Sequence, residues 1–334
     1  MVSMKDIAAK CGVSVATVSK SLNDHSDIGE ETKKMIRDTA KQMGYFPNSS
    51  ARALKTKRTY NIGVLFVDDS QSGLTHDYFA NVLDSFKRYA EGHGYDITFI
   101  NAQVRKNMTY LEHSRYRGVD GVVIACVDFS DKDVVDLIYS DLPVVTIDHV
   151  FDNRISVVSD NIGGMKDLTE YVIRCGHKKI AYIFGDDTAV TKNRVASFYN
   201  TLKQYDITPD ESFVKASEYR NPSKAYEATK KLLRLKNRPT CILYPDDYSA
   251  IGGLNAIKDV GLSVPDDISI AGYDGLYVSQ IIDPKLTTIK QDTAEIGTIA
   301  ARQLIRLIED PKSTLIEKIV VPGKVLDGAS VKNI

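Results

Sequence analysis

The spacing of hydrophobic residues changes near residue 60 of this 334-residue chain. In the first part, Ile7, Ala8 and Cys11 form one apolar stripe at helical spacing, which predicts a short helix over residues 4–10. Beyond residue 60, short apolar runs alternate with amphipathic stretches, a pattern typical of repeated βα units. The chain is therefore expected to have a small helical N-terminal part and a larger α/β body.

Three helices are predicted for the N-terminal part. Gly12 can adopt the positive φ of a tight turn after the first helix. Ser14 can cap a second helix that carries Val18 and Leu22 on its inward face. A third helix is expected from about Glu31 to Met43. This spacing is that of a helix-turn-helix motif, although a small three-helix domain with no nucleic-acid role has the same pattern.

Charge separates the two parts and favours a nucleic-acid role for the first. Residues 1–60 contain 11 Lys and Arg against 6 Asp and Glu, whereas the remaining residues contain 32 against 38. The net charge of −1 for the whole chain conceals this asymmetry. A positive module on a mildly negative body is suited to contact with nucleic-acid phosphates.

The body has the pattern of buried strands joined by helices, which predicts parallel sheets. Strands are expected at 61–67, 95–100, 121–127, 143–147, 179–184, 240–244 and 269–273. Helices are expected after Phe79 and near 162–174, 194–205, 223–235 and 247–260. About 270 residues are too many for one sheet, so we expect two α/β lobes with a ligand in the cleft between them.

Signatures of several other protein classes are missing from the sequence. Gly92–Tyr95 offers Gly-x-Gly without a third glycine, and the six His residues have no metal-ligand spacing. We therefore expect no enzyme activity, no metal and no cofactor. Scattered cysteines, no signal peptide and no apolar run of membrane length favour a cytoplasmic protein that does not contact a membrane.

Four segments resemble the lactose-repressor (LacI/GalR) family of bacterial transcription regulators: KDIAAKCGVSVATVSKSLN, EETKKMI, GYFPNSSARAL and NIGVLFV. The resemblance implies a helix-turn-helix domain at 1–46, a hinge helix and linker at 47–60, and an effector-binding and dimerisation body at 61–334. Such a body is similar to periplasmic sugar-binding proteins and has two lobes. Lobe one would comprise about 61–161 and 291–322, and lobe two about 162–290 and 323–334.

In this family the second helix of the motif lies in the major groove, and Val15, Ala16 and Lys20 match its base-reading positions. Lys20 can donate to guanine O6 and N7, whereas Val15 and Ala16 can make only apolar contacts, for example with a thymine methyl. Lys20 stands where Arg is commoner. Because a single ammonium cannot form the two-pronged bond of a guanidinium, weaker discrimination at that base is expected.

Other residues of the first part are candidates for contacts that carry no base readout. Side chains suited to phosphate oxygens are Ser14, Thr17, Ser19 and Asn23, although each could instead be a helix cap or a solvated residue. The resemblance implies that the hinge enters the minor groove through Asn48, Ala51, Arg52 and Leu54. Leu54 could wedge between base steps, and the alternative is a flexible linker whose Leu packs on the body.

Four polar residues of the body match the family's effector site, namely Asp148, Arg194, Asp246 and Asp274. Carboxylates and a guanidinium can each hold two neighbouring sugar hydroxyls. The alternative is that an Asp after a strand only caps the next helix, and Asp247 is expected to be such a cap. The family usually has Asn where Asp246 stands and Gly where Ser197 stands. The extra carboxylate is expected to pair with a cation on the effector or with Arg194.

Two aromatic residues follow a loop that differs from the family's shorter stretch. Tyr78 or Phe79 could stack on a sugar ring, with His76 and Asp77 as further candidates for ligand contact. The alternative, strongest for Phe79, is that the ring packs on the sheet beside Val82.

Together these features predict a homodimeric, cytoplasmic bacterial regulator, a repressor, that binds double-stranded operator DNA under the control of a small carbohydrate effector. One alternative is a soluble sugar-binding or sensory protein whose N-terminal module makes protein contacts. Another is a sugar-active enzyme on the same α/β frame. The positive N-terminal module argues against both alternatives.

Overall fold

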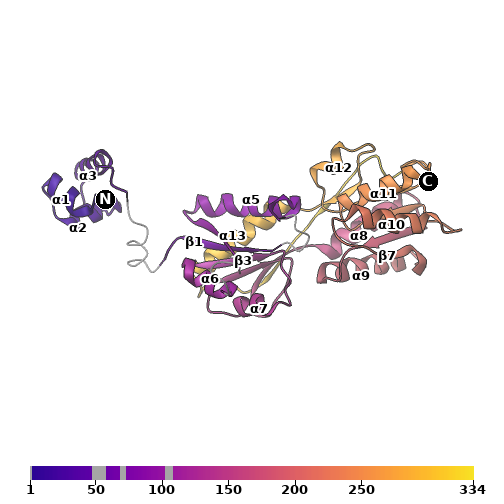
Figure 1. Cartoon of the computed structure of the whole chain (residues 1–334), viewed down its shortest axis with the longest axis horizontal. Coiled ribbons are helices and arrows are strands. Elements are labelled where there is room, and N and C mark those ends of the chain that lie inside the picture. Colours follow the sequence, from indigo (N-terminus) through magenta and orange to yellow (C-terminus); the bar gives the residue numbers. More distant parts are fainter. Residues whose placement is uncertain (1, 47–57, 68–72, 102–107) are drawn as a thin grey trace. The chain divides into compact units, whose positions relative to one another are not determined.

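The computed structural model describes residues 2–46, 58–67, 73–101 and 108–334 (Figure 1). The chain forms two compact units, Met1–Thr59 and Tyr60–Ile334. The first unit is helical and the second is α/β, as the change in hydrophobic spacing predicted.

Three short helices surround one small core in the N-terminal unit: α1 (Met4–Cys11), α2 (Val15–Leu22) and α3 (Glu30–Gln42). The buried core residues are Ile7, Ala8, Val18, Ile36 and Ala40. Leu22, expected on the inward face of α2, is only half-buried, whereas Ser21 is fully buried. The third helix begins and ends one residue earlier than predicted.

Local signals set the ends of the first two helices. Ser3 and Asp6 form a capping box, in which the backbone N–H of Ser3 donates to Asp6 Oδ2 over 2.8 Å. Gly12 ends α1 with φ 66°, a conformation that favours glycine. Ser14 Oγ then accepts the backbone N–H of Thr17 over 3.0 Å and so caps α2.

A six-stranded parallel sheet with the order β11-β5-β4-β3-β1-β2 forms one half of the body, here called lobe one. Its strands are β1 (Asn61–Phe66), β2 (Asp96–Ile100), β3 (Gly121–Ala125), β4 (Val144–Ile147), β5 (Ile155–Ser159) and β11 (Lys318–Val321). Its helices are α5 (Asp77–Gly92), α6 (Tyr110–Arg117), α7 (Lys132–Ile138) and α13 (Thr293–Glu309), with a 3₁₀ turn at Gly73–Thr75.

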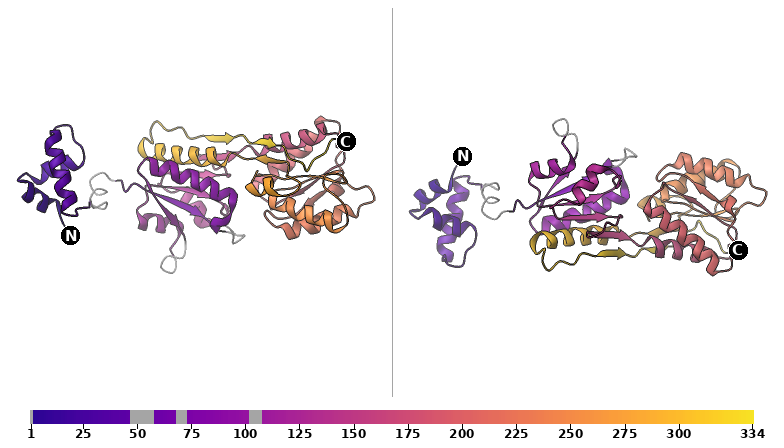
Figure 2. Two further views of the ribbon diagram at one scale, coloured as in Figure 1. Left: turned by 90° about the horizontal axis from the view of Figure 1, so that it is seen from above. Right: turned by 90° about the horizontal axis from the view of Figure 1, so that it is seen from below.

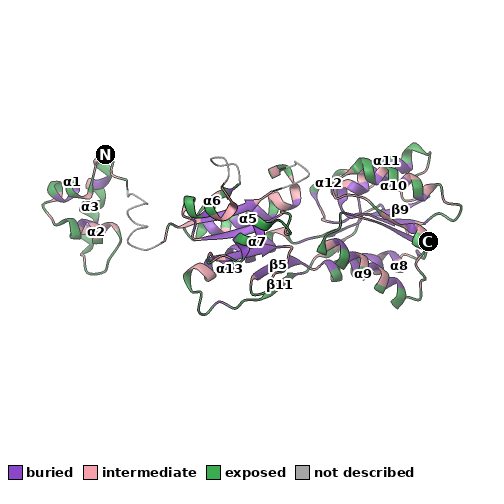
Figure 3. Cartoon of the chain, turned by 60° about the horizontal axis from the view of Figure 1, so that its bottom comes forward, coloured by how far each residue is buried: buried purple, intermediate pink, exposed green. Residues whose placement is uncertain are grey.

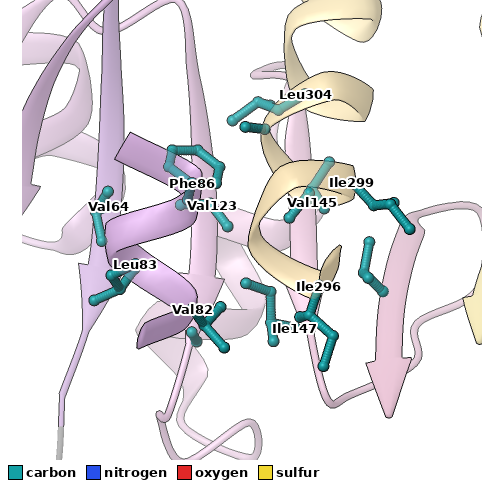
Figure 4. Close-up of a cluster of buried hydrophobic side chains, with 14 of the residues drawn as sticks. Val64, Val82, Leu83, Phe86, Val123, Val145, Ile147, Ile296, Ile299 and Leu304 are labelled. Carbon is teal, nitrogen blue, oxygen red and sulfur yellow. The ribbon is translucent and has the colours of Figure 1, made fainter. Parts of the chain in front are cut away.

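Helices cover both faces of this sheet, which explains why its strands are apolar runs rather than alternating patterns. Val64, Val123 and Val145 pack against α5 and α13, as the close-up in Figure 4 shows. Their strand neighbours, such as Val122 and Ile124, point to the opposite face and pack with residues of α7. In Figure 3 the central strands are accordingly coloured as buried between helices whose outer sides are exposed.

A four-stranded parallel sheet with the order β7-β6-β8-β9 forms the other half, lobe two. Its strands are β6 (Ile180–Phe184), β7 (Val214–Ala216), β8 (Cys241–Leu243) and β9 (Ser269–Ala271). Its helices are α8 (Asn161–Arg174), α9 (Ala189–Gln204), α10 (Pro222–Leu233), α11 (Asp247–Asp259) and α12 (Tyr277–Ile281), with a 3₁₀ turn at Glu211–Phe213.

Two short strands, β10 (Thr288–Lys290) and β12 (Lys324–Leu326), pair antiparallel outside the two main sheets. Between them the chain returns to lobe one, forms α13 beside α5 and adds β11 to the edge of the six-stranded sheet (Figure 2). The parallel sheets were predicted, but this antiparallel ladder and α13 were not. Lobe one is therefore completed by α13 and β11, which follow the helices and parallel strands of lobe two in the sequence.

Candidate functional site

The exposed side of α2 carries the three residues predicted to read bases. Val15 is 41 % exposed, and Ala16 and Lys20 are exposed as well. At 3.6 residues per turn these three positions share one side of the helix, while Val18 lies on the other side, in the core. The arrangement leaves this side of α2 free to meet a large ligand.

An ion pair that the sequence did not predict joins Lys20 to Asp27, just beyond α2. Both side chains are about half exposed, and the hydrogen bond from Lys20 holds the pKa of Asp27 below its usual value. Any acceptor that Lys20 contacts must compete with this carboxylate.

The residues predicted to contact phosphates also take part in capping. The hydroxyl oxygens of Ser14 and Thr17 lie 2.9 Å apart at the start of α2. At its end, Asn23 Nδ2 donates to the carbonyl of Ser19 over 2.7 Å. The alternative of helix caps thus describes Ser14 and Asn23, and both remain exposed. The predicted hinge contacts Asn48, Ala51, Arg52 and Leu54 lie outside the described residues.

A cavity of about 580 Å³ lies between the two lobes of the body. All six residues predicted for the effector site line it: Tyr78, Phe79, Asp148, Arg194, Asp246 and Asp274. His76 lines it too, whereas Asp77 does not and instead accepts a hydrogen bond from the hydroxyl of Tyr248.

Strand ends bring the three aspartates together. Asp148 follows β4, Asp246 follows β8 and Asp274 follows β9, so each stands beyond the carboxyl end of a parallel strand. Asp148 and Asp274 have positive φ values of 58° and 104°, which is uncommon for non-glycine residues. Backbone strain of this kind is typical of ligand sites, where the surrounding structure holds it in place.

Arg194 is only 3 % exposed and lies in the second turn of α9. The helix expected near 194–205 begins five residues earlier, at Ala189. Its Nε donates to Asn161 Oδ1 over 2.8 Å, its Nη1 donates to the carbonyl of Pro245 over 3.0 Å, and the guanidinium lies 3.5 Å from the centroid of the Tyr273 ring. These contacts fix the guanidinium at the cavity wall.

Ser197 stands where the family usually has Gly, and the structure accommodates it. Its hydroxyl donates to the carbonyl of Ile162 over 2.7 Å and so ties α9 to α8. The departure therefore adds a contact between two helices without filling the cavity, which Ser197 does not line.

Asp148 is held by two donors from lobe one. It accepts the hydroxyl of Tyr78 over 2.7 Å and the backbone N–H of Ser159 over 2.9 Å. Burial raises the pKa of Asp148, and these hydrogen bonds oppose the rise. Tyr78 belongs to the core of lobe one, while Phe79 is less buried and packs against the rings of Phe66 and His76. The alternative to ligand contact was packing of the ring on the sheet. Both Tyr78 and Phe79 pack on the core of lobe one, and both also line the cavity.

The roles of the two neighbouring aspartates differ from the prediction. Asp246, not Asp247, is the N-cap of α11, and it accepts both the backbone N–H and the hydroxyl of Ser249 over 2.8 Å. Asp247 accepts the hydroxyl of Thr288 over 2.6 Å and the backbone N–H of Leu276 over 2.7 Å. Asp247 therefore ties α11 to the segment after β9. Only Asp246 lines the cavity.

Asp274 is the most strongly perturbed acid of the cavity wall. It accepts a hydrogen bond from Gln291 Nε2 over 2.7 Å. Burial, with repulsion from Asp246 and Asp148, raises the pKa of Asp274 to about 7, against the attraction of Arg194. Near neutral pH this side chain can act either as a carboxylate acceptor or as a neutral carboxyl donor.

Comparisons with known proteins identify the family. A model of the lacI family of bacterial regulatory proteins matches residues 3–48, and a model of the periplasmic binding protein-like domain matches residues 169–331. The probable HTH-type transcriptional repressor ExuR of Bacillus subtilis (strain 168) is 31% identical over 337 residues, which cover 100% of this chain and 99% of ExuR. The chain belongs to the LacI family.

A further relative and two solved structures are similar to this LacI-family protein. The HTH-type transcriptional repressor PurR of Mannheimia succiniciproducens is 32% identical over 341 residues, covering 100% of both chains. The lac repressor dimer bound to operator and the anti-inducer ONPF has the same fold, with a TM-score of 0.84 over 99% of both chains at 24% identity. A LacI-family regulator from Enterococcus faecium with bound ribose has a TM-score of 0.70 at 25% identity, over 82% of this chain and 99% of its own.

The family settles the broad class. This protein is a DNA-binding transcriptional repressor of the LacI type, and its relatives are repressors rather than enzymes. A free-standing sugar-binding protein and a sugar-active enzyme, the two alternatives, are therefore set aside. Among the described residues no group of three or more His, Cys, Asp or Glu side chains could hold a metal ion, and none of the helices is long and apolar enough to cross a membrane.

Three residues that the sequence did not point to also line the cavity of the LacI-family protein: Glu218, Tyr219 and Arg220. They lie between β7 and α10. Because β7 has only three residues, the apolar pattern was too short to predict this strand or the residues that follow it. The pair Asn221-Pro222 was the available signal, because Asn caps and Pro begins α10. On the lobe-one side the rings of Phe129 and His149 are stacked with centroids 4.3 Å apart.

Proposed function

We propose that this protein binds operator DNA as a homodimer and responds to a small polyhydroxylated effector, a sugar or sugar derivative, held between its two lobes. One observation carries the proposal: the six residues expected at the effector site, drawn from both lobes, line one cavity of about 580 Å³. That volume lies within the range of small-molecule sites. The ribose-bound regulator of the same fold supports a sugar.

The cavity wall offers the chemistry that a sugar requires. Asp148, Asp246 and Asp274 supply oxygen acceptors, and Arg194 supplies fixed donors, so neighbouring hydroxyl groups can be held in pairs. Phe129, stacked on His149, supplies a flat apolar surface for the face of a sugar ring. Because the site residues come from two lobes, the effector binds different arrangements of the lobes with different affinities. Control of DNA binding by an effector requires such a difference.

On the DNA, we propose that α2 enters the major groove with Lys20 toward a guanine and with Val15 and Ala16 against apolar base edges. Ser14, Thr17, Ser19 and Asn23 lie at or near the ends of the same helix and position it on phosphates. A dimer places two such helices on the half-sites of a near-palindromic operator.

Operator binding tests the proposal directly. The full-length protein is expected to bind a near-palindromic operator from its own regulatory regions specifically, with an affinity that falls steeply as salt rises, because Lys and Arg displace counterions from phosphates. Fluorescence anisotropy at several salt concentrations measures this slope, and a scrambled duplex is the control. Equal affinity for operator and scrambled duplex at low salt would contradict the proposal.

Lys20 provides a sharper test of base reading. Lys20→Ala is expected to weaken operator binding by about tenfold or more, with a much smaller loss on the scrambled duplex, because a lost base contact costs about 1–3 kcal/mol. Lys41→Ala, at an exposed site in the last turn of α3, is the matched control and should lower both affinities alike. Lys20→Arg should match or exceed the wild type in its preference for operator over the scrambled duplex, since a guanidinium can form two hydrogen bonds to guanine. A parallel loss on both duplexes for Lys20→Ala would place Lys20 on phosphate.

A further inference from the structure

Arg220 is held at the cavity wall in a strained backbone conformation. Its φ is 51°, and its backbone N–H donates to Asp246 Oδ2 over 2.8 Å. A non-glycine residue persists in this left-handed region only where the surrounding structure fixes it, and such residues gather at ligand sites. Asp246, the carboxylate that departs from the family pattern, therefore positions Arg220.

The side chain of Arg220 is poorly satisfied by the protein groups around it. Its Nε and Nη1 atoms are buried and have no hydrogen-bond acceptor among the residues that the structure describes. Its Nη2 reaches the carbonyl of Thr75 in lobe one at 3.4 Å, near the limit for a hydrogen bond, and the guanidinium lies 5.1 Å from the centroid of the Tyr248 ring. Buried donors of this kind are destabilising until an acceptor arrives.

The acidic residues of the wall already have donors of their own. Each of the five accepts at least one hydrogen bond from the protein: Asp148, Asp186, Glu218, Asp246 and Asp274. The other cation of the cavity wall, Arg194, donates to an amide oxygen and a carbonyl, both of them neutral. Within the described ranges, neither guanidinium of the cavity forms an ion pair with a carboxylate.

We infer that Arg220 binds an anionic group of the effector, a carboxylate or a phosphate, so that the protein responds to an acidic sugar derivative rather than to a neutral sugar. An oxyanion in the cavity can accept a charge-assisted hydrogen bond from Nε or from Nη1 once the side chain turns toward it; the two groups lie on different edges of the guanidinium, so each needs an acceptor of its own. The volume of about 580 Å³ holds a monosaccharide acid or phosphate. The inference deepens the proposed function and rests on the cavity being the effector site.

Matched pairs of ligands test the inference on the full-length protein. Isothermal titration compares D-glucose with D-glucuronate and D-glucose 6-phosphate, and D-galactose with D-galacturonate. At least one acidic ligand is expected to bind about tenfold or more tightly than its neutral parent, as hydrogen bonds to charged groups imply. The uronates and the phosphate distinguish the two sources of negative charge.

Variants assign the preference to Arg220. Arg220→Gln is expected to remove it, with a loss of about tenfold to a hundredfold for the acidic ligand and little change for the neutral parent. Arg220→Gly also removes the charge and relieves the left-handed strain, so it serves if the Gln variant does not fold. Lys192→Gln is the matched control: this exposed lysine of α9 pairs with Asp187, does not line the cavity, and its loss should leave the preference intact.

Two outcomes overturn the inference. One is that every acidic ligand binds no tighter than its neutral parent, or not at all. The other is that Arg220→Gln keeps the preference of the wild type. Failure of the proposed function is recognised separately, because in that case the wild-type protein does not distinguish operator from a scrambled duplex.

Discussion

Gly297→Ala is expected to lower the free energy of unfolding of the body by about 3 kcal/mol, because α13 and α5 touch at this glycine. A Cβ at residue 297 would lie 2.1 Å from the carbonyl oxygen of Val82, 2.2 Å from Ser85 Oγ and 2.9 Å from the backbone nitrogen of Phe86. Two of these neighbours are backbone atoms, so they cannot rotate away. The helices would have to separate.

Separation of the two helices would disturb the core of lobe one. On either side of Gly297, Ile296 and Ile299 pack into the same buried cluster as Val82 and Phe86, which Figure 4 shows around α13. The gain of about 1 kcal/mol from the better helix propensity of alanine is too small to offset this loss.

Gly92→Ala is the matched control, because Gly92 is also helical, at the last residue of α5, but no atom lies within 4 Å of its ideal Cβ. This variant should be neutral or slightly more stable. Urea unfolding followed by circular dichroism measures both changes. Equal stability of the two variants would show that the approach of α13 to α5 is looser than described.

Asp274→Asn is expected to stabilise the ligand-free protein above pH 7 and to remove part of its pH dependence. In the folded state burial raises the pKa of Asp274 from 3.8 to about 7. Between these two values the folded protein binds a proton that the unfolded chain does not. The free energy of unfolding therefore falls as the pH rises from about 4 to about 7, and this contribution is lost entirely above pH 7.

A shift of this size corresponds to a loss of a few kcal/mol above pH 7, at about 1.4 kcal/mol per pKa unit. Asparagine stays neutral, can still accept the hydrogen bond from Gln291, and tolerates the positive φ of this position. Thermal unfolding at pH 5 and pH 8 should therefore show a smaller difference for Asp274→Asn than for the wild type. The acceptor charge is also lost, so we expect weaker effector binding.

Asp206→Asn is the control for this prediction, since Asp206 is exposed and has a similar left-handed backbone, with φ 54°. It removes one carboxylate from the surface and leaves the cavity as it is, so it controls for the loss of a charge as such. If Asp274→Asn and the wild type lost stability in parallel between pH 5 and pH 8, the carboxyl of Asp274 would have to be ionised at little cost in the folded state.

Most of the site was predictable because its residues follow strong local signals. Asp148 follows a strand of lobe one, and Asp246 and Asp274 follow strands of lobe two; the carboxyl ends of parallel strands are where ligands of α/β folds bind. Arg220 was not predictable in this way, because β7 is too short to give an apolar pattern. Arg220 is important because its Nε and Nη1 lack hydrogen-bond acceptors. Whether they have acceptors depends on the groups that surround the side chain in space, and not on its neighbours in sequence.

Sequence also could not decide which of the two aspartates after β8 caps α11. Sequence spacing allows either Asp246 or Asp247 to cap α11, since both stand at the junction of strand and helix. The choice depends on Leu276 and Thr288, which bind Asp247 from about 30 and 40 residues away. Likewise, the ion pair of Lys20 with Asp27 depends on the path of the loop after α2.

The sequence by itself determined the helix-turn-helix unit, the exposed positions on α2, the predicted strands of both parallel sheets and the aspartates at their ends, because these depend on caps, periodicity and residues close together in the chain. Only the tertiary structure decided that α13 packs beside α5 and β11 pairs with β5, that Asp246 caps α11 and holds Arg220, and that the acids of the cavity are satisfied while Arg220 is not. Those features arise from contacts between distant segments, where burial and competition for hydrogen bonds, rather than local propensity, set the outcome.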